Sequence, residues 1–272
     1  MTAIVTVERT AGTAGTEGAH SDIIARFVRS RAGTVDDDAL RIVGAAIDLP
    51  AAGACIRLPA ANASAKMARS VELVNVGTVS VDLSNASSGA PSALLPRHLP
   101  DVADLVSGVV YTARGEGDAF PARGHYVFHA TGTPEQELAP FTVEATAKGD
   151  PGDVRIADQA TAHRAEPIAI SASEPTEVTW TASAEASPED DLVYIDVIAR
   201  PPGTATVRCS FGDTGRGALA ASTFAGDEGI ISVHRVHRES FRAKGIDSGV
   251  LRFDFAHVSS FRRIATQDAP HR

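Results

Sequence analysis

Short runs in which apolar and polar residues alternate recur along the whole chain and constrain its fold more than any other feature. Side chains on a β-strand point alternately to two faces, so these runs predict strands. Clusters of Gly, Pro, Asp and Ser separate the runs at intervals of about 8–15 residues, which is typical of antiparallel sandwiches. The expected strands are residues 4–7, 23–29, 54–58, 71–74, 79–83, 106–112, 124–131, 141–147, 154–157, 167–171, 177–182, 192–199, 204–211, 230–236, 250–255 and 258–261.

Helical periodicity is scarce by comparison. Three segments carry part of an i, i+3, i+4, i+7 apolar pattern, namely residues 22–30, 36–47 and 101–106. The first also alternates with period two, so a strand is expected there, and the third could form one or two turns after Pro100. Helices long enough to connect parallel strands are missing from the pattern. We therefore predict an all-β fold and not an α/β sheet.

The length of 272 residues suits two small domains or one large one. The sequence K-G-D-P-G-D at residues 148–153 joins two strand-rich halves and has the Gly, Pro and charge content of a linker. We therefore predict two β-sandwich domains, an N-terminal one at residues 1–148 and a C-terminal one at residues 149–272. The alternative is a hairpin or crossover within one domain.

The second half carries a pattern of strands and turns around its one tryptophan. Val178 and Trp180 share a strand face, and a Y-x-V-type strand and a D-x-G turn follow. This pattern resembles the fibronectin type III and immunoglobulin-like modules of bacterial exported proteins over roughly residues 165–258. The resemblance implies that the second domain is an immunoglobulin-like β-sandwich, and it implies no active site. The matching residues are Trp180, Tyr194, Ile195, Asp196, Val197, Cys209, Asp213 and Gly215.

The chain has two cysteines, Cys55 and Cys209, one in each half. No C-x-x-C motif is present, which excludes cysteine-based zinc and thioredoxin-type sites. A disulfide would join the two halves, whereas unpaired buried thiols would act as small apolar side chains. Both cysteines lie in stretches apolar enough for core strands of separate sandwiches. We therefore expect them to be unpaired and buried.

Histidine and acidic pairs are candidate metal ligands. His125 and His129 would share a strand face about 13 Å apart, and His234 and His237 would face opposite sides of a strand. Neither pair resembles the helical H-E-x-x-H motif.

The acidic runs at residues 36–38 and 189–191 lack the D-x-D-x-D-G pattern of a calcium loop, so they are expected to be solvated turn charges. Calcium between the domains is the alternative. We assign no metal ligands.

Catalytic motifs are missing as well. The chain has neither a G-x-S-x-G elbow nor an S-x-x-K motif, and Ser107-Gly108 carries no triad signature. The glycine-containing turns at residues 115–118 and 212–217 lack the strand–loop–helix context of a phosphate-binding loop. We therefore assign no catalytic or cofactor-binding residues, expect no cofactor, and favour a non-catalytic protein over an enzyme.

Charge and hydropathy narrow the range of partners. The net charge of −9 disfavours a nucleic-acid partner, and no apolar stretch reaches the length of a membrane span. The first ten residues show no signal peptide. On fold class we expect a structural or binding module of a periplasmic or cell-surface protein, with a protein or glycan partner.

Two other functions remain open. A carbohydrate-binding or hydrolase accessory protein would need a row of exposed aromatic side chains, for which the candidates are Tyr111, Tyr126 and Tyr194. A cytoplasmic β-sandwich assembly subunit would be favoured if both cysteines stay reduced.

Overall fold

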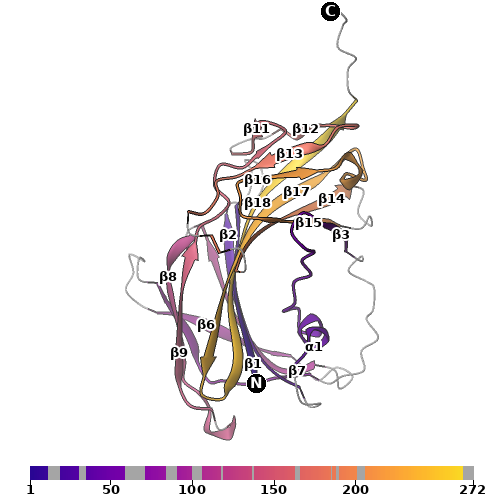
Figure 1. The fold of residues 1–272 in the computed structure, drawn as a ribbon. Coiled ribbons are helices and arrows are strands. Elements are labelled where there is room, and N and C mark those ends of the chain that lie inside the picture. Colours follow the sequence, from indigo (N-terminus) through magenta and orange to yellow (C-terminus); the bar gives the residue numbers. More distant parts are fainter. Residues whose placement is uncertain are drawn as a thin grey trace, which may run out of the picture.

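Two stacked β-sandwiches share the two longest strands of the chain, β17 (Glu228–Ala243) and β18 (Ile246–Ile264) (Figure 1). The computed structural model describes residues 1–11, 19–30, 35–58, 71–83, 91–99, 106–117, 119–136, 138–162, 166–184, 186–187, 190–200 and 206–265. The protein is all-β, as the sequence predicts. The described residues form one six-residue α-helix and two short 3-10 turns, so they include no helix with the length and apolarity of a membrane span.

The first half of the chain supplies β1 (Thr2–Ala11), β2 (His20–Ser30), α1 (Asp37–Ile42), β3 (Cys55–Arg57), β4 (Val71–Leu73), β5 (Val79–Leu83), β6 (Ser92–Leu99), β7 (Val106–Glu116), β8 (Arg123–Ala130), η1 (Pro134–Gln136) and β9 (Phe141–Lys148). The second half supplies β10 (Arg155–Ile156), β11 (Gln159–Ala160), β12 (Ile168–Ser171), β13 (Thr176–Thr179), β14 (Asp191–Arg200), β15 (Val207–Gly212), β16 (Arg216–Leu219), η2 (Ala221–Thr223), β17 and β18.

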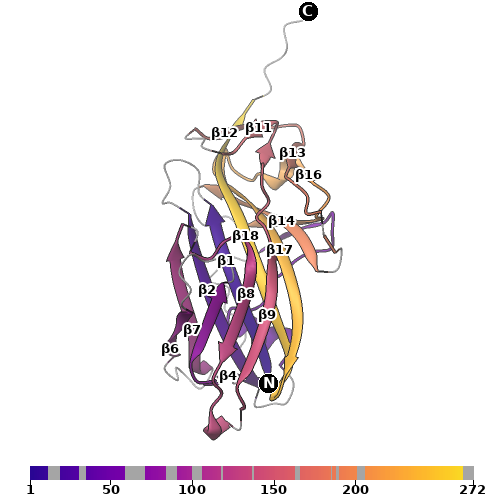
Figure 2. The ribbon, with the colours of Figure 1, turned by 90° about the vertical axis from the view of Figure 1, so that its left-hand side faces the viewer.

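One sheet of 14 strands runs in the order β3-β15-β14-β17-β18-β1-β2-β4-β7-β6-β5-β8-β9, with β12 beside β18. In the first sandwich this sheet folds back on itself, so that β8 and β9 face β1 and β2 (Figure 2). Strand β6 makes the corner, because its first residues pair with β5 and its last residues pair with β7. The core between the layers is rich in buried aromatic rings, namely Phe27, Tyr111, Tyr126, Phe128, Phe253 and Phe255.

The second sandwich packs the other end of β17 and β18, with β14 and β15, against a four-stranded sheet in the order β11-β10-β13-β16. Trp180 is 5% exposed in the core between these sheets, which confirms the inward orientation expected from its alternation with threonines. The same core contains residues of β14, β17 and β18, including Ile195, Val233 and Phe261.

Hydrogen bonds cross between the predicted domains. Strand β1 pairs in parallel with β18 over its whole length, from Thr2 opposite Ser248 to Ala11 opposite His257. The connection after β9 is tied down as well, because Pro151 is buried and its carbonyl accepts a 2.9 Å hydrogen bond from Thr181 N–H. The boundary between residues 148 and 149 stays a prediction about independent folding.

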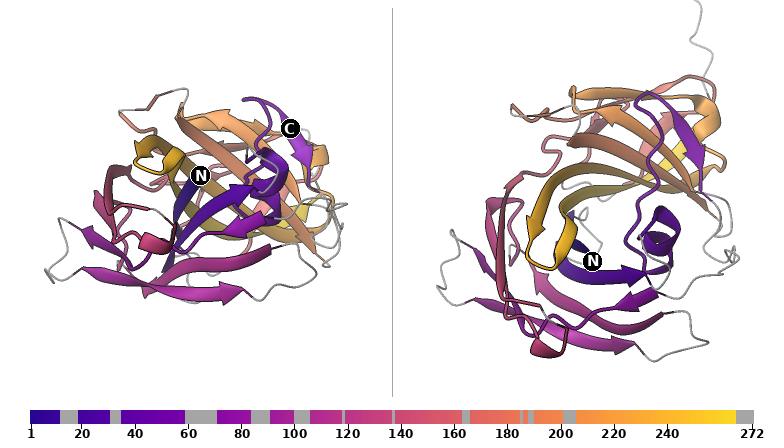
Figure 3. Two further views of the ribbon diagram at one scale, coloured as in Figure 1. Left: turned by 90° about the horizontal axis from the view of Figure 1, so that it is seen from below. Right: turned by 60° about the horizontal axis from the view of Figure 1, so that its bottom comes forward.

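The expectation of unpaired cysteines is wrong, because Cys55 and Cys209 form a disulfide. Residues 43–54, which we call the strap, run from α1 to β3 across the face of the shared sheet (Figure 3). Strand β3 then pairs with β15 so that Cys55 lies directly opposite Cys209, with their Cα atoms 4.0 Å apart. Cys209 is buried as expected, whereas Cys55 lies exposed on the edge strand.

Candidate functional site

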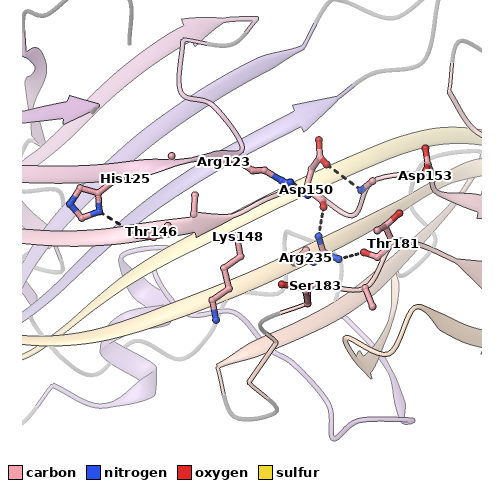
Figure 4. Close-up of a pocket in the computed structure, with 14 residues that line it drawn as sticks. Arg123, His125, Thr146, Lys148, Asp150, Asp153, Thr181, Ser183 and Arg235 are labelled. Atoms are coloured by element: carbon pink, nitrogen blue, oxygen red, sulfur yellow. Dashed lines mark hydrogen bonds between the residues drawn. The ribbon is translucent and has the colours of Figure 1, made fainter. Parts of the chain in front are cut away.

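A cleft of about 910 Å³ opens where the two sandwiches meet. Its walls come from the ends of β8 and β9, the connection at residues 149–153, and residues 181–184 beyond β13. Figure 4 shows Arg235 of β17 between Thr181 and Asp150 in this cleft. Because residues of both sandwiches line the cleft, its shape depends on how the two sandwiches pack against each other.

An ion pair anchors the floor of the cleft. The Arg235 guanidinium lies 3.0 Å from the Asp213 carboxylate, and both side chains are almost completely buried. Arg235 also donates hydrogen bonds to the carbonyls of Asp150 and Thr181, which fixes the two walls to β17. Asp213 accepts a 2.8 Å hydrogen bond from Trp180 Nε1. The pair therefore connects the floor to the core of the second sandwich.

A second network closes the seam between β9 and β17. Lys148 Nζ lies 2.9 Å from Asp191 Oδ2, and His237 Nδ1 lies 2.7 Å from Asp191 Oδ1. His237 Nε2 in turn contacts Glu239 at 3.1 Å, and the same Glu239 oxygen accepts a hydrogen bond from Thr146 N–H.

Opposing effects set the pKa of Asp191. Burial raises it, but hydrogen bonds from Ser187 N–H and Lys148 and the charge of His237 outweigh burial and leave this pKa below its usual range. Asp191 is therefore a stable anion that holds Lys148 at the edge of the cleft.

The rim of the cleft carries both signs of charge. Arg123 and Asp153 are exposed, and Lys148 and Asp150 are partly exposed. The lining contains no Phe, Tyr or Trp side chain among the residues described. Such a surface suits charged and hydrogen-bonding groups of a partner rather than an apolar ligand.

His234 and His237 lie on opposite faces of β17, as the sequence predicts. His237 joins the seam network, whereas His234 lies on the opposite face, 2.8 Å from Asp254 and stacked on Tyr194. His125 and His129 on β8 contact the acidic residues of neighbouring strands, Glu144 and Asp82 respectively.

Within the described ranges, no three His, Cys, Asp or Glu side chains come together as a metal site would require. The prediction of no metal ligands stays untested, since no metal-bound state is described.

All three residues of the first acidic run have a structural explanation. Asp36 caps α1 by accepting a 3.0 Å hydrogen bond from Ala39 N–H, and Asp37 and Asp38 lie in the first turn, where negative charge is favourable. In the second run Asp191 is buried and not solvated, which corrects the expectation for that residue, and Glu189 lies outside the described residues.

The structure also places the Ser107-Gly108 pair and the glycine-containing turn at residues 115–118. Ser107 belongs to β7. Of the turn expected at residues 115–118, Gly115 and Glu116 are the last residues of β7 and Gly117 lies in a turn, with Asp118 outside the described residues.

The three tyrosines do not form an exposed aromatic row. Tyr111, Tyr126 and Tyr194 are at most 3% exposed. Tyr111 and Tyr126 lie in the core of the first sandwich, and the Tyr194 hydroxyl donates a 2.8 Å hydrogen bond to Asp254. A glycan-binding platform built on these rings is therefore ruled out.

The chain matches no protein-family model and no curated protein. Its function is therefore inferred from the cleft and the disulfide.

Proposed function

We propose that this protein is a non-catalytic binding module of a bacterial extracytoplasmic protein, and that the cleft between its sandwiches holds a protein partner. The cleft carries this proposal, because residues from both sandwiches line it and charges of both signs surround it. Complementary charges of this kind give an interface its specificity and speed its association. The lack of aromatic rings in the described lining favours a protein over a glycan.

The disulfide supports the extracytoplasmic location. Disulfides persist in oxidising compartments such as the periplasm and the cell surface, and they are rare in the cytosol. The Cys55–Cys209 bond joins the two halves of the chain, so it has the structural role that disulfides have in exported proteins. The same reasoning disfavours a cytoplasmic assembly subunit.

The C-terminal sandwich supports the same proposal at the level of fold. Its two facing sheets bury Trp180 with Ile195 and Val197 of the next long strand, in the arrangement that the resemblance to immunoglobulin-like modules implies. We propose that it is a module of that class and that it presents one wall of the cleft.

Site-directed crosslinking tests the cleft. A photo-crosslinking residue at position 153, on the rim, is expected to capture one partner protein in intact cells of the native host. Arg123→Glu should abolish that capture because it reverses a rim charge. The matched control is the same crosslinker at position 93, an exposed site on β6. Identical products from both positions, or capture that survives Arg123→Glu, would contradict the proposal.

A further inference from the structure

A second cavity lies on the other face of the shared sheet, away from the cleft. It has a volume of about 220 Å³, is open to solvent on one side and lies between the strap, α1 and strands β17 and β18. Figure 1 shows α1 on the side of the sheet opposite β8 and β9. The volume is below that of sites for drug-sized ligands, so the cavity suits a small molecule or ion.

Two arginines form the sheet side of this cavity. Arg238 on β17 lies directly opposite Arg252 on β18, and both side chains line the cavity. Like charges directly opposite each other on antiparallel strands are destabilising. Arg26 on β2 adds a third positive charge to the same face, where it is attracted by Glu8 and repelled by Arg252.

Carboxylates of the described residues act on this pair at a distance and not through direct ion pairs. Glu8 and Asp254 interact electrostatically with Arg252. Asp254 and Asp190 interact in the same way with Arg238. Within the described part of the chain, no carboxylate oxygen lies within ion-pair distance of Arg238 or Arg252. Burial, followed by the charge of Arg252, lowers the pKa of Arg238. The nearby Asp254 carboxylate is already engaged by Tyr194 and His234.

Arg252 also has unused hydrogen-bonding capacity. Its side chain is 8% exposed, and its Nη1 donates a 3.0 Å hydrogen bond to the carbonyl of Ala45 in the strap. Its Nε–H is buried and has no acceptor among the described residues. A buried donor without an acceptor is destabilising, and more so when the group is charged.

The acidic side chains at the cavity do not neutralise this pair. Asp48 pairs with Arg41 at 2.7 Å, and Asp37 is exposed in the first turn of α1. We propose that the cavity beneath the strap binds a small oxyanion, a phosphate or carboxylate group, between Arg238 and Arg252. An oxyanion would supply acceptors and a negative charge in direct contact with these arginines, and arginine binds both groups well.

Thermal unfolding of the full, oxidised chain tests this proposal. Sodium phosphate and sodium acetate are each titrated at constant ionic strength, with sodium chloride as the reference. A specific site gives a rise in Tm that levels off as the site fills, whereas general stabilisation by phosphate keeps increasing with its concentration. A saturating rise with phosphate alone assigns a phosphate site, one with acetate alone assigns a carboxylate site, and one with both supports a general oxyanion site. No saturating rise with either anion overturns the proposal.

The variant Arg238→Met separates binding from folding. It is expected to weaken phosphate or acetate binding about tenfold or more, because it removes one charged donor. Without added anion it should be as stable as the wild type or more stable, because it removes a like-charge contact between directly opposed residues. The control is Arg262→Met, an equal change in charge at an exposed arginine. Equal anion effects in both variants, or a lower Tm of Arg238→Met without anion, would overturn the proposal.

Discussion

Asp213 accepts hydrogen bonds from three sources, the indole of Trp180, the Ser183 N–H and the guanidinium of Arg235. Asp213→Asn is expected to lower the free energy of unfolding by about 3–5 kcal/mol, because it leaves the buried Arg235 charge without its counter-charge. Chemical denaturation followed by the fluorescence of Trp180 measures this loss.

The matched control for Asp213→Asn is Glu228→Gln, which breaks the exposed pair with Arg262. That substitution should cost at most about 1 kcal/mol, because solvent screens exposed ion pairs. Similar losses for the two variants would show that Asp213 does not anchor the floor of the cleft.

Asp191 predicts an acid-dependent loss of stability. Its pKa is lower in the folded protein than the unfolded value of about 3.9, so its stabilising contribution is complete above about pH 5. This contribution is lost as the pH falls through the folded pKa. Urea unfolding between pH 7 and pH 3 should therefore show the gap between wild type and Asp191→Asn shrinking with acid. A gap that stays constant with pH would contradict this, and Asp38→Asn at an exposed position is the control.

At the level of elements, strands β4 and β7 pair in parallel at Gly108, which has φ of +119°. A Cβ atom there would lie 1.8 Å from the backbone oxygen of Leu73. Gly108→Ala is therefore expected to cost roughly 2–3 kcal/mol more than Gly117→Ala. Gly117 also has positive φ but has no atom near its Cβ position, so it controls for backbone strain. Equal losses in thermal unfolding would show that the two strands separate without cost.

Most strands are predictable from the sequence because their alternation matches one buried face. Strand β5 has the expected limits of residues 79–83, and α1 lies inside the candidate segment 36–47. Strand β6 was not predicted, because Pro96 reads as a strand breaker and most of its residues are exposed. The expected strands 250–255 and 258–261 are one strand, β18, and β16 lies partly within a segment read as a turn.

The candidate site was much less predictable. Arg235 alternates with valines in a strand, and nothing in its neighbourhood indicates a partner 22 residues away in sequence. The composition around Lys148 predicts a linker, whereas its side chain contacts Asp191, 43 residues later. Such pairings depend on which strands become neighbours. Strands β9 and β17 are far apart in the sheet order and come close only because the sheet folds back on itself, and local patterns carry no information about that contact.

At the scale of the whole molecule, the Cys55–Cys209 disulfide bears on both the cellular compartment of the protein and its stability. Alkylation of protein from the native host should add two alkyl groups only after reduction, as measured by mass spectrometry. The double variant Cys55→Ser/Cys209→Ser is expected to lose about 2–5 kcal/mol of stability. Free thiols in the host protein would overturn the extracytoplasmic proposal and favour a cytoplasmic assembly subunit.

The shared strands predict that the chain unfolds in one step. Phe253 of β18 belongs to the core of the first sandwich, and Phe261 of the same strand belongs to the core of the second. Scanning calorimetry is therefore expected to show a single transition, with equal calorimetric and van't Hoff enthalpies. Two resolved transitions would instead support a boundary between residues 148 and 149.

The pairing of β1 with β18 also sets the order of events during synthesis. Strand β1 has its parallel partner at residues 246–264, and β17 and β18 contribute to both cores, so neither core can close before these late strands leave the ribosome. At a synthesis rate of about 5–20 residues per second, β1 waits roughly 10–50 s without its final neighbour. During that interval a chaperone can bind the unfolded chain, or the unfolded chain can be translocated into another compartment.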